Sequence, residues 1–313
     1  MPVIHNRKQK KIYYTYTITE GQTEAWDLVF KDKENWKKVN ERENQDFFYG
    51  SDNKNHGGET YFKKKYTKYF HRKHNFFNIL SNNNVLCCPK TYTSYNTFLK
   101  NEQMNNKMWF LKMSSMDCGS GVVPFITNKK EIKKPIKYLD DDYYIIQKGI
   151  ENLLLYKDRK FDCRVHALIT GDGNVYIFKE AIIRISWKKF SQTCSCKKHQ
   201  LTNGSLGVEA ISSHDFALWK QCFPSVLKAT REIMDVMLSY RDKKRYALIG
   251  LDFIFDKNNK AWVLEANTYP NLYYGPDPHL QQISTRMLSS LLDIVVLKKE
   301  NSTLWTPVYC SKN

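Results

Sequence analysis

Two carboxylates and an amide near the C-terminal end of the chain have the types and spacing of a cation site. Asp252, Glu265 and Asn267 lie in an otherwise largely apolar segment, 245–267. Burying two anions together is costly unless a cation compensates them. Mg²⁺ prefers oxygen ligands, takes few of them from the protein and completes its octahedron with water and phosphate. The three side chains therefore predict a magnesium site. The alternative is a hairpin whose polar residues face water, with Asp252 paired to a lysine.

The element that must position these groups is predicted to be a β-hairpin. Two runs rich in β-branched and aromatic residues flank the turn-forming sequence at 257–260. A register that pairs Asp256 with Ala261 places Asp252 opposite Glu265. Because side chains two residues apart share a face of a strand, the amide two residues beyond Glu265 joins the carboxylates.

A lysine followed by a glycine-containing loop has the composition of a phosphate site. Lys112 ends a short apolar run that predicts a strand, and Gly119 and Gly121 follow in a loop of small residues. Glycines let backbone N–H groups approach an anion closely, and the lysine supplies a point charge. An ordinary turn is the alternative. The loop is not a Walker A motif, because the closing lysine and hydroxyl residue of that motif are missing.

A second hairpin is predicted around Gly173, which suits the left-handed position of a three-residue loop. The implied register places Arg164 opposite Glu180. Asp162, Arg164 and Arg184 then lie on one face with Glu180. A mixed-charge face between apolar strands is a candidate wall for a polar substrate, and a solvated sheet face is the alternative.

A basic and aromatic segment, 61–80, admits two interpretations. Such interleaving is typical of proteins that bind single-stranded nucleic acid. It also fits a helix that buries its aromatic rings while its lysines stay in water, and the periodicity favours the helix.

Two further helices are predicted, one over 224–240 with Pro224 in its first turn and one that begins at Asp277 and Pro278.

Composition narrows the partners and the compartment. The 313 residues contain 49 Lys plus Arg and 32 Asp plus Glu, for a formal net charge of +17. A basic surface suits an acidic polypeptide, a nucleotide or nucleic acid, but no zinc-finger spacing or RNP-like stretch favours nucleic acid. The chain offers no apolar run of membrane-spanning length and no secretory leader. We expect a cytoplasmic protein with free thiols, for which association with microtubules is one alternative.

The blocks fall in an order that resembles the tubulin–tyrosine ligase and ligase-like family of the ATP-grasp superfamily. The resemblance covers roughly residues 107–295, whereas residues 1–105 do not align. The matching segments are Lys112 with Gly119 and Gly121 (phosphate loop), Gln147-Lys148-Gly149-Ile150 (adenine hinge), Lys160-Phe161-Asp162-Cys163-Arg164, Lys179-Glu180 with Arg184, Leu201-Thr202-Asn203, Gly250-Leu251-Asp252, and Leu264-Glu265-Ala266-Asn267 before Pro270.

The resemblance implies an α+β, ATP-grasp fold, in which two lobes hold ATP between antiparallel sheets. A smaller N-terminal domain, 1–105, with a candidate role in substrate binding, would precede the catalytic region 106–313. That region would divide into a central lobe at about 106–150 and a C-terminal lobe at about 151–313. The implied reaction joins tyrosine, glutamate or glycine to a carboxylate of an acidic protein tail, such as that of tubulin, through an acyl phosphate. The implied partners are ATP, Mg²⁺, a free amino acid and the acidic tail, and a monomer is expected.

The resemblance also implies a role for each matching side chain. Nucleotide binding falls to Lys112, Gly119, Gly121, Gln147, Lys148, Gly149, Ile150 and Asp162. Metal binding falls to Asp252, Glu265 and Asn267, and the reacting end to Arg164, Arg184, Thr202 and Asn203. Four positions depart from the family pattern: Cys118, Gly149, Gln200 and Tyr269. Two alternatives stay open, namely an ATP-grasp ligase with a non-tubulin acceptor and a non-catalytic relative that binds polyanions or microtubules.

Overall fold

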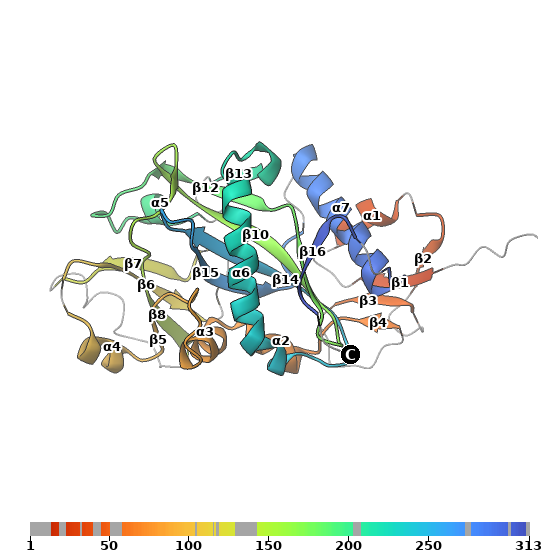
Figure 1. Cartoon of the computed structure of the whole chain (residues 1–313), viewed down its shortest axis with the longest axis horizontal. Coiled ribbons are helices and arrows are strands. Elements are labelled where there is room, and N and C mark those ends of the chain that lie inside the picture. The colour runs from red at the N-terminus through yellow and green to blue at the C-terminus, as the bar shows by residue number, and fades with distance from the viewer. Residues whose placement is uncertain are drawn as a thin grey trace, which may run out of the picture.

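A computed structural model shows an elongated molecule with a large central sheet, a small sheet at one end and a third sheet at the other (Figure 1). The strands of the first two sheets are antiparallel, so the chain is α+β, as predicted. No helix among the described residues is long and apolar enough to cross a membrane. The structure describes residues 14–18, 23–31, 33–39, 45–50, 58–103, 105–114, 116, 119–128, 143–202, 208–272, 277–299 and 302–310.

The central sheet has eight described strands and is organised around β10, which pairs with β9, β11, β12 and β14. Ten of the eleven residues of β10 are buried, so it forms the spine of the core. The strands are β9 (Leu155–Tyr156), β10 (Arg159–Ile169), β11 (Val175–Phe178), β12 (Ile182–Lys189), β13 (Glu209–Ser212), β14 (Ala247–Phe255), β15 (Ala261–Thr268) and β16 (Trp305–Tyr309).

The predicted C-terminal hairpin is β14–β15, and its register differs from the prediction near the turn. Phe255, not Asp256, lies opposite Ala261. A β-bulge then leaves Leu264 as one extra residue on β15, since Phe253 pairs with Val263 and the next residue back pairs with Glu265. The bulge compensates for the one-residue error, so Asp252 does lie opposite Glu265, as predicted.

The small sheet has the strand order β5-β8-β6-β7 and a core of its own. Phe98, Trp109 and Phe125 pack together there, separately from the main hydrophobic cluster. The separation leaves room for a cleft between the small and central sheets. The elements are β5 (Thr91–Tyr92), α4 (Tyr95–Asn101), β6 (Met108–Met113), β7 (Val122–Ile126) and β8 (Tyr144–Lys148).

The N-terminal sheet is parallel and shares the main hydrophobic cluster with the central sheet. Tyr246, which precedes β14, stacks on Phe47 with ring centroids 5.5 Å apart and donates a hydrogen bond to the Phe48 carbonyl at 3.0 Å. The N-terminal sheet is thereby anchored to the central one. Its elements are β1 (Tyr14–Ile18), α1 (Thr23–Phe30), β2 (Trp36–Lys38), β3 (Phe47–Tyr49) and β4 (Glu59–Thr60).

The predicted helix in segment 61–80 is two helices, which break at Arg72, where the backbone is extended (ψ 111°). The aromatic rings are buried or half-buried, as predicted, but the expectation that the lysines stay in water is wrong for Lys73, which is 4% exposed. The two helices are α2 (Lys64–His71) and α3 (Lys73–Asn82).

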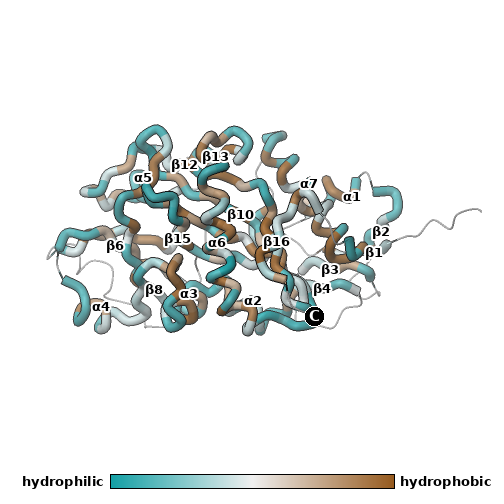
Figure 2. Tube along the Cα trace, in the orientation of Figure 1, coloured by the Kyte–Doolittle hydropathy of each residue, from teal (hydrophilic) through white to brown (hydrophobic). Residues whose placement is uncertain are grey.

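Helices α6 and α7 complete the core, and α6 crosses in front of the central sheet (Figure 1). Asp277 caps α7, accepting hydrogen bonds from the backbone of His279 and Leu280, as predicted. The prediction of Pro224 in the first turn of α6 is wrong, because the helix begins five residues earlier. Figure 2 shows apolar stretches along the central strands. The remaining helices are α5 (Lys197–Gln200), η3 (Ser213–Asp215), α6 (Trp219–Met237), η4 (Leu238–Tyr240) and α7 (Pro278–Val295).

Candidate functional site

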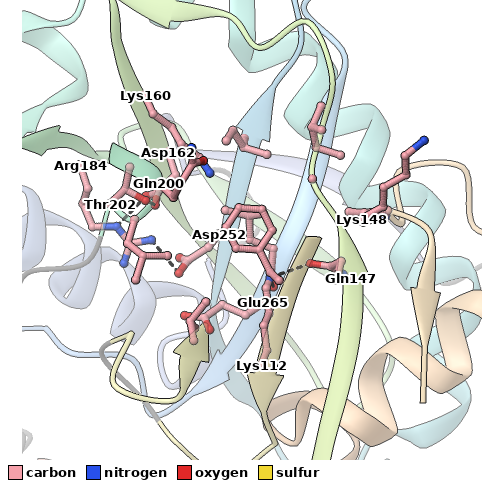
Figure 3. Close-up of a pocket in the computed structure, with 18 residues that line it drawn as sticks. Lys112, Gln147, Lys148, Lys160, Asp162, Arg184, Gln200, Thr202, Asp252 and Glu265 are labelled. Atoms are coloured by element: carbon pink, nitrogen blue, oxygen red, sulfur yellow. Dashed lines mark hydrogen bonds and ion pairs between the residues drawn. The ribbon is translucent and has the colours of Figure 1, made fainter. Parts of the chain in front are cut away.

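A cleft of about 650 Å³ lies between the small sheet and the central sheet. One wall comes from β6 and β8, the other from β10, β12, β14 and β15, and the segment after α5 closes one end (Figure 3). The lining residues are Pro89, Phe110, Lys112, Val122, Gln147, Lys148, Gly149, Ile150, Lys160, Asp162, Arg184, Gln200, Leu201, Thr202, Asp252, Ile254, Leu264 and Glu265.

Two arginines and two aspartates form a buried charge network on the central sheet. Arg164 binds Asp252 through two nitrogens, its Nε on Oδ1 and its Nη2 on Oδ2, the latter at 2.8 Å. Arg184 bridges the aspartates, with Nε 2.6 Å from Asp162 Oδ1 and Nη2 2.7 Å from Asp252 Oδ2. Gly250 permits this packing, because a Cβ there would lie 2.8 Å from Arg164 Cδ.

The two aspartates respond differently to burial. Burial acts to raise the pKa of Asp252, but Arg164 and Arg184 outweigh it and hold that pKa well below its usual range. Burial also raises the pKa of Asp162, and there it prevails over Arg184 and over the hydroxyl of Thr202, which donates to Oδ2. The charged form of Asp252 is therefore favoured, whereas Asp162 protonates more readily than usual.

A lysine from the small sheet faces this network across the cleft. Lys112 Nζ donates to Gln147 Oε1 at 2.6 Å and to the Leu264 carbonyl at 3.3 Å. The Leu264 carbonyl belongs to the bulge residue of β15. Burial lowers the pKa of Lys112 to about 7 and that of Lys160 to about 8. An anion bound in the cleft would stabilise the charged forms of these two buried amines.

Glu265 is more exposed than the two aspartates of the cleft, with its side chain 20% exposed. Its Oε1 accepts from Asn267 Nδ2 at 3.1 Å and lies 3.7 Å from Arg164 Nη2. Its Oε2 lies 3.4 Å from Lys73 Nζ, which also donates to the Met116 carbonyl at 2.9 Å. Helix α3 thus brings a third buried lysine to the carboxylate pair.

The predicted metal ligands supply an oxygen-rich donor set of a suitable kind for Mg²⁺. Two carboxylates lie opposite each other on paired strands, and an amide oxygen follows on the same face. Within the described residues, no group of three or more His, Cys, Asp or Glu side chains is placed to hold a metal ion. These side chains suit a cation that takes the rest of its coordination shell from phosphate and water. To bind it, Asp252 would give up at least one of its hydrogen bonds from the arginines.

The hinge residues border the other end of the cleft. Gln147 is fixed between Lys112 and Thr91, whose Oγ1 accepts from Nε2 at 3.0 Å. Lys148 pairs with Glu151 at 3.1 Å, and its ammonium points away from the acidic network (Figure 3). Within the described part of the chain, the Ile150 backbone N–H makes no hydrogen bond. It is a donor available to a ligand.

Most predicted site residues meet in the cleft, and four do not line it. Gly119 and Gly121 lie in the turn that leads into β7, where Val122 N donates to Gly119 O at 3.2 Å, and neither lines the cleft. Arg164 and Asn267 do not line the cleft but contact residues that do, namely Asp252 and Glu265. Asn203 and Cys118 fall outside the described residues.

The predicted pairing of Arg164 with Glu180 is wrong. The pairing register of β10 changes at the point where its partner strand changes from β11 to β12. Arg164 therefore lies opposite Ile182. Glu180 sits in the break between those strands and pairs instead with Arg286 on α7 at 2.6 Å. It therefore does not belong to the charged face formed by Asp162, Arg164 and Arg184.

Sequence reasoning missed four residues as parts of the site. Lys160 lies two residues before Asp162 on β10, a spacing that could have placed it on the same face. Phe110 lines the cleft, and its ring centroid lies 4.8 Å from Lys160 Nζ. Gln200 is buried and held by the carbonyls of the preceding loop. Lys73 gave no signal, because nothing in the sequence relates α3 to the hairpin.

Comparison with known proteins points in the same direction. The tubulin-tyrosine ligase family model matches residues 53–215 and 217–304, which extends well before residue 107. The probable tubulin polyglutamylase TTLL2 of Homo sapiens is 23% identical over 248 residues, covering 67% of this chain and 39% of that protein. The probable alpha-tubulin polyglutamylase Ttll1 of Tetrahymena thermophila is 23% identical over 253 residues, covering 66% and 60%.

A relative named for a different activity is similar to a comparable share of the chain. The tubulin glycylase 3D of Tetrahymena thermophila is 25% identical over 221 residues, covering 61% of this chain and 21% of that protein. The matches thus span between a fifth and three fifths of the length of these three relatives.

Proposed function

Because the chain belongs to the tubulin-tyrosine ligase family, we propose that it is an ATP-dependent ligase that joins an amino acid to a carboxylate of an acidic protein tail. The relatives are named as tubulin polyglutamylases and a tubulin glycylase, which favours tubulin as the acceptor. The observation that carries the proposal is the cleft, in which Lys112 of one sheet faces Asp252 and Glu265 of the other. A triphosphate needs cations on its oxygens. One wall of the cleft offers Lys112, and the other offers Lys160 and Arg184 together with the carboxylates proposed to hold Mg²⁺.

The proposed reaction has two steps. An acceptor carboxylate oxygen attacks the γ-phosphorus of ATP, the bond to the β-γ bridging oxygen breaks, and ADP leaves with that electron pair. The amine of the incoming amino acid then attacks the acyl carbon, an amide bond forms, phosphate leaves and the amine gives up a proton. Both steps develop negative charge on phosphoryl oxygens, so positioned cations lower the barrier.

The lysines of the cleft supply this charge. Lys112 and Lys160 are buried and have lowered pKa values, of about 7 and about 8, so an anionic triphosphate would favour their charged forms. Lys73, whose Nζ lies 3.4 Å from Glu265 Oε2, adds a third ammonium next to the carboxylates. Ile150 offers its backbone N–H to the base at the hinge.

Asp252, Glu265 and Asn267 would hold Mg²⁺, which, when bound, offsets charge on the phosphate oxygens. The same carboxylates restrain the arginines before substrate arrives, since Arg164 and Arg184 are both paired with Asp252. A guanidinium fork fits a planar carboxylate as well as a phosphoryl group. In the proposed complex these arginines exchange Asp252 for the acceptor carboxylate, and Thr202 with Asp162 lines the reacting end.

A ligation screen tests this function. Purified protein is incubated with Mg²⁺, ATP, tubulin and isotope-labelled tyrosine, glutamate or glycine, and the products are analysed by mass spectrometry. We expect transfer of one of the three to a tail carboxylate, with loss of transfer in Glu265→Gln and retention in Glu209→Gln. Glu209 is the matched control, because it is half exposed and pairs with Arg159 away from the cleft. Folded protein that transfers none of them to tubulin or to a cell lysate contradicts the proposal.

A further inference from the structure

A basic segment leaves the cleft along β12 and returns to it after α5. Its two ends, Arg184 and Thr202, both line the cleft. Figure 3 shows them with Gln200 on the same side of the cleft. The residues between these ends, 185–201, include four lysines and no Asp or Glu. This end of the cleft is therefore bordered by positive charge.

A β-bulge near the end of β12 exposes an aromatic side chain. Ile185 pairs with Phe161 and Lys189 pairs with Arg159, so three residues of β12, 186–188, lie opposite the single residue 160 of β10. A bulge of this kind redirects the side chains that it carries. Trp187, in the bulge, is 62% exposed, although a tryptophan is usually largely buried. The bulge lies opposite a residue that lines the cleft.

The lysines near the bulge are open to an anionic partner. Helix α5 lies beside β12 (Figure 1), where His199 Nδ1 is 2.7 Å from Lys189 O. Lys188 and Lys198 are exposed, and neither forms an ion pair with another described residue. Lys189 lies 3.1 Å from Asp158, but these side chains are 77% and 72% exposed. An ion pair in water contributes little, so a new partner can replace it.

The make-up of this surface favours an acidic polypeptide as its occupant. One exposed tryptophan among lysines does not form the broad apolar face with which a segment lies in a membrane. It also does not form the row of rings on which a single-stranded nucleic acid stacks. An extended acidic chain can pair its carboxylates with the lysines, while its aliphatic stems pack on the indole. The same chain can reach Arg184 with one of its carboxylates.

We propose that Trp187, Lys188, Lys189 and Lys198 form a docking surface for the acidic stretch of the acceptor protein that flanks the modified carboxylate. The inference rests on the proposed function, because it names the surface that holds the acceptor outside the same cleft. The lysines attract the acidic stretch, and Trp187 adds contact area at the bulge. Docking there raises the concentration of the acceptor carboxylate at the cleft.

The test measures binding of a fluorescein-labelled peptide of ten glutamates by fluorescence anisotropy, without ATP or Mg²⁺. The variant is Lys188→Glu/Lys198→Glu, and the matched control is Lys64→Glu/Lys65→Glu on α2, which changes the net charge equally at two exposed lysines. We expect the dissociation constant to rise by about tenfold or more in the variant and by less than about threefold in the control. Trp187→Ala, which keeps the net charge, should weaken binding by about fivefold.

Equal weakening by the two double variants, or a larger effect of the control, overturns the inference. It is also overturned if the folded, unaltered protein does not bind the peptide. Vesicles of phosphatidylserine and phosphatidylcholine form a second arm. If Trp187→Ala abolishes vesicle binding and leaves peptide binding unchanged, the surface belongs to a membrane and the inference is wrong. Because the peptide assay needs no nucleotide, protein that binds the peptide through this surface but ligates no amino acid contradicts the proposed function alone.

Discussion

Removing the charge of Arg184 tests the buried network of the cleft. Its guanidinium lies 2.6 Å from Asp162 and 2.7 Å from Asp252, whose side chains are 1% and 2% exposed. Arg184→Met keeps most of the aliphatic stem and removes the cation. Breaking a buried ion pair by deleting one partner costs about 3–5 kcal/mol, because the remaining charge stays desolvated.

The structure indicates that Arg184→Met costs about 3 kcal/mol, the lower end of the range for a broken buried ion pair. Asp252 keeps its two contacts with Arg164, so the uncompensated charge falls on Asp162, which keeps only the Thr202 hydroxyl among its contacts described above. The pKa of Asp162 is already raised by burial, and loss of Arg184 raises it further. Asp162 can then take up a proton, which limits the expected loss to about 3 kcal/mol at pH 7.5.

The sign of the pH dependence follows from the same shift. A carboxyl whose pKa is raised on folding binds more protons in the folded chain than in the unfolded one, so stability falls as pH rises through that window. In the variant the shift of Asp162 is larger than in the unaltered protein. The destabilisation caused by Arg184→Met should therefore be smaller at pH 5.5 than at pH 7.5.

Urea unfolding followed by tryptophan fluorescence at the two pH values measures the effect. Arg159→Met is the matched control, since Arg159 is on β10 and pairs with Glu209 at 2.7 Å, where the side chains are 23% and 50% exposed. An exposed pair of this kind contributes under about 1 kcal/mol. The reasoning is refuted if Arg184→Met costs no more than Arg159→Met, or if its cost does not depend on pH.

Two further predictions concern nucleotide binding and the N-terminal sheet. Burial lowers the pKa of Lys112 to about 7, and phosphates would favour its charged form, so ATP binding should take up a proton. The dissociation constant of ATP should therefore rise by up to about tenfold per pH unit above about pH 7. Calorimetry of Lys112→Met should show no such pH dependence. Tyr269, whose φ is +55°, donates from its hydroxyl to Gly50 O at 2.9 Å, and its ring centroid lies 4.1 Å from that of Tyr61. Tyr269→Phe should lower the free energy of unfolding by about 1 kcal/mol, measured by thermal unfolding. An effect no larger than that of Tyr309→Phe, at an exposed tyrosine, would contradict a stabilising role for this hydrogen bond.

The sequence predicted the elements that carry the site better than their pairing. Two runs rich in β-branched and aromatic residues around a turn sequence predict the β14–β15 hairpin, and Asp252 does lie opposite Glu265. That agreement depended on a bulge at Leu264, which no local pattern announces, because a bulge is stabilised by contacts across the sheet. The carbonyl of the same residue accepts from Lys112 of the other wall.

Errors arose where distant segments decide the geometry. Arg164 was assigned to Glu180 by extending one hairpin register, but β10 changes partner from β11 to β12 along its length. A single amphipathic helix over 61–80 places Lys73 in water, whereas in the structure α3 packs against the site and buries this lysine. Contacts between elements far apart in sequence leave no periodic signal, so spacing alone could not reveal them.

The central claim is that Lys112 and Glu265, from opposite walls, serve one Mg²⁺-ATP site. The direct measurement is calorimetric titration of ATP, with and without Mg²⁺, into the unaltered protein, Lys112→Met, Glu265→Gln and the control Glu209→Gln. We expect binding by the unaltered protein and the control, a loss of about tenfold or more in Lys112→Met, and loss of the magnesium dependence in Glu265→Gln. ATP bound equally well by all four proteins, or by none of them while folded, would contradict the claim.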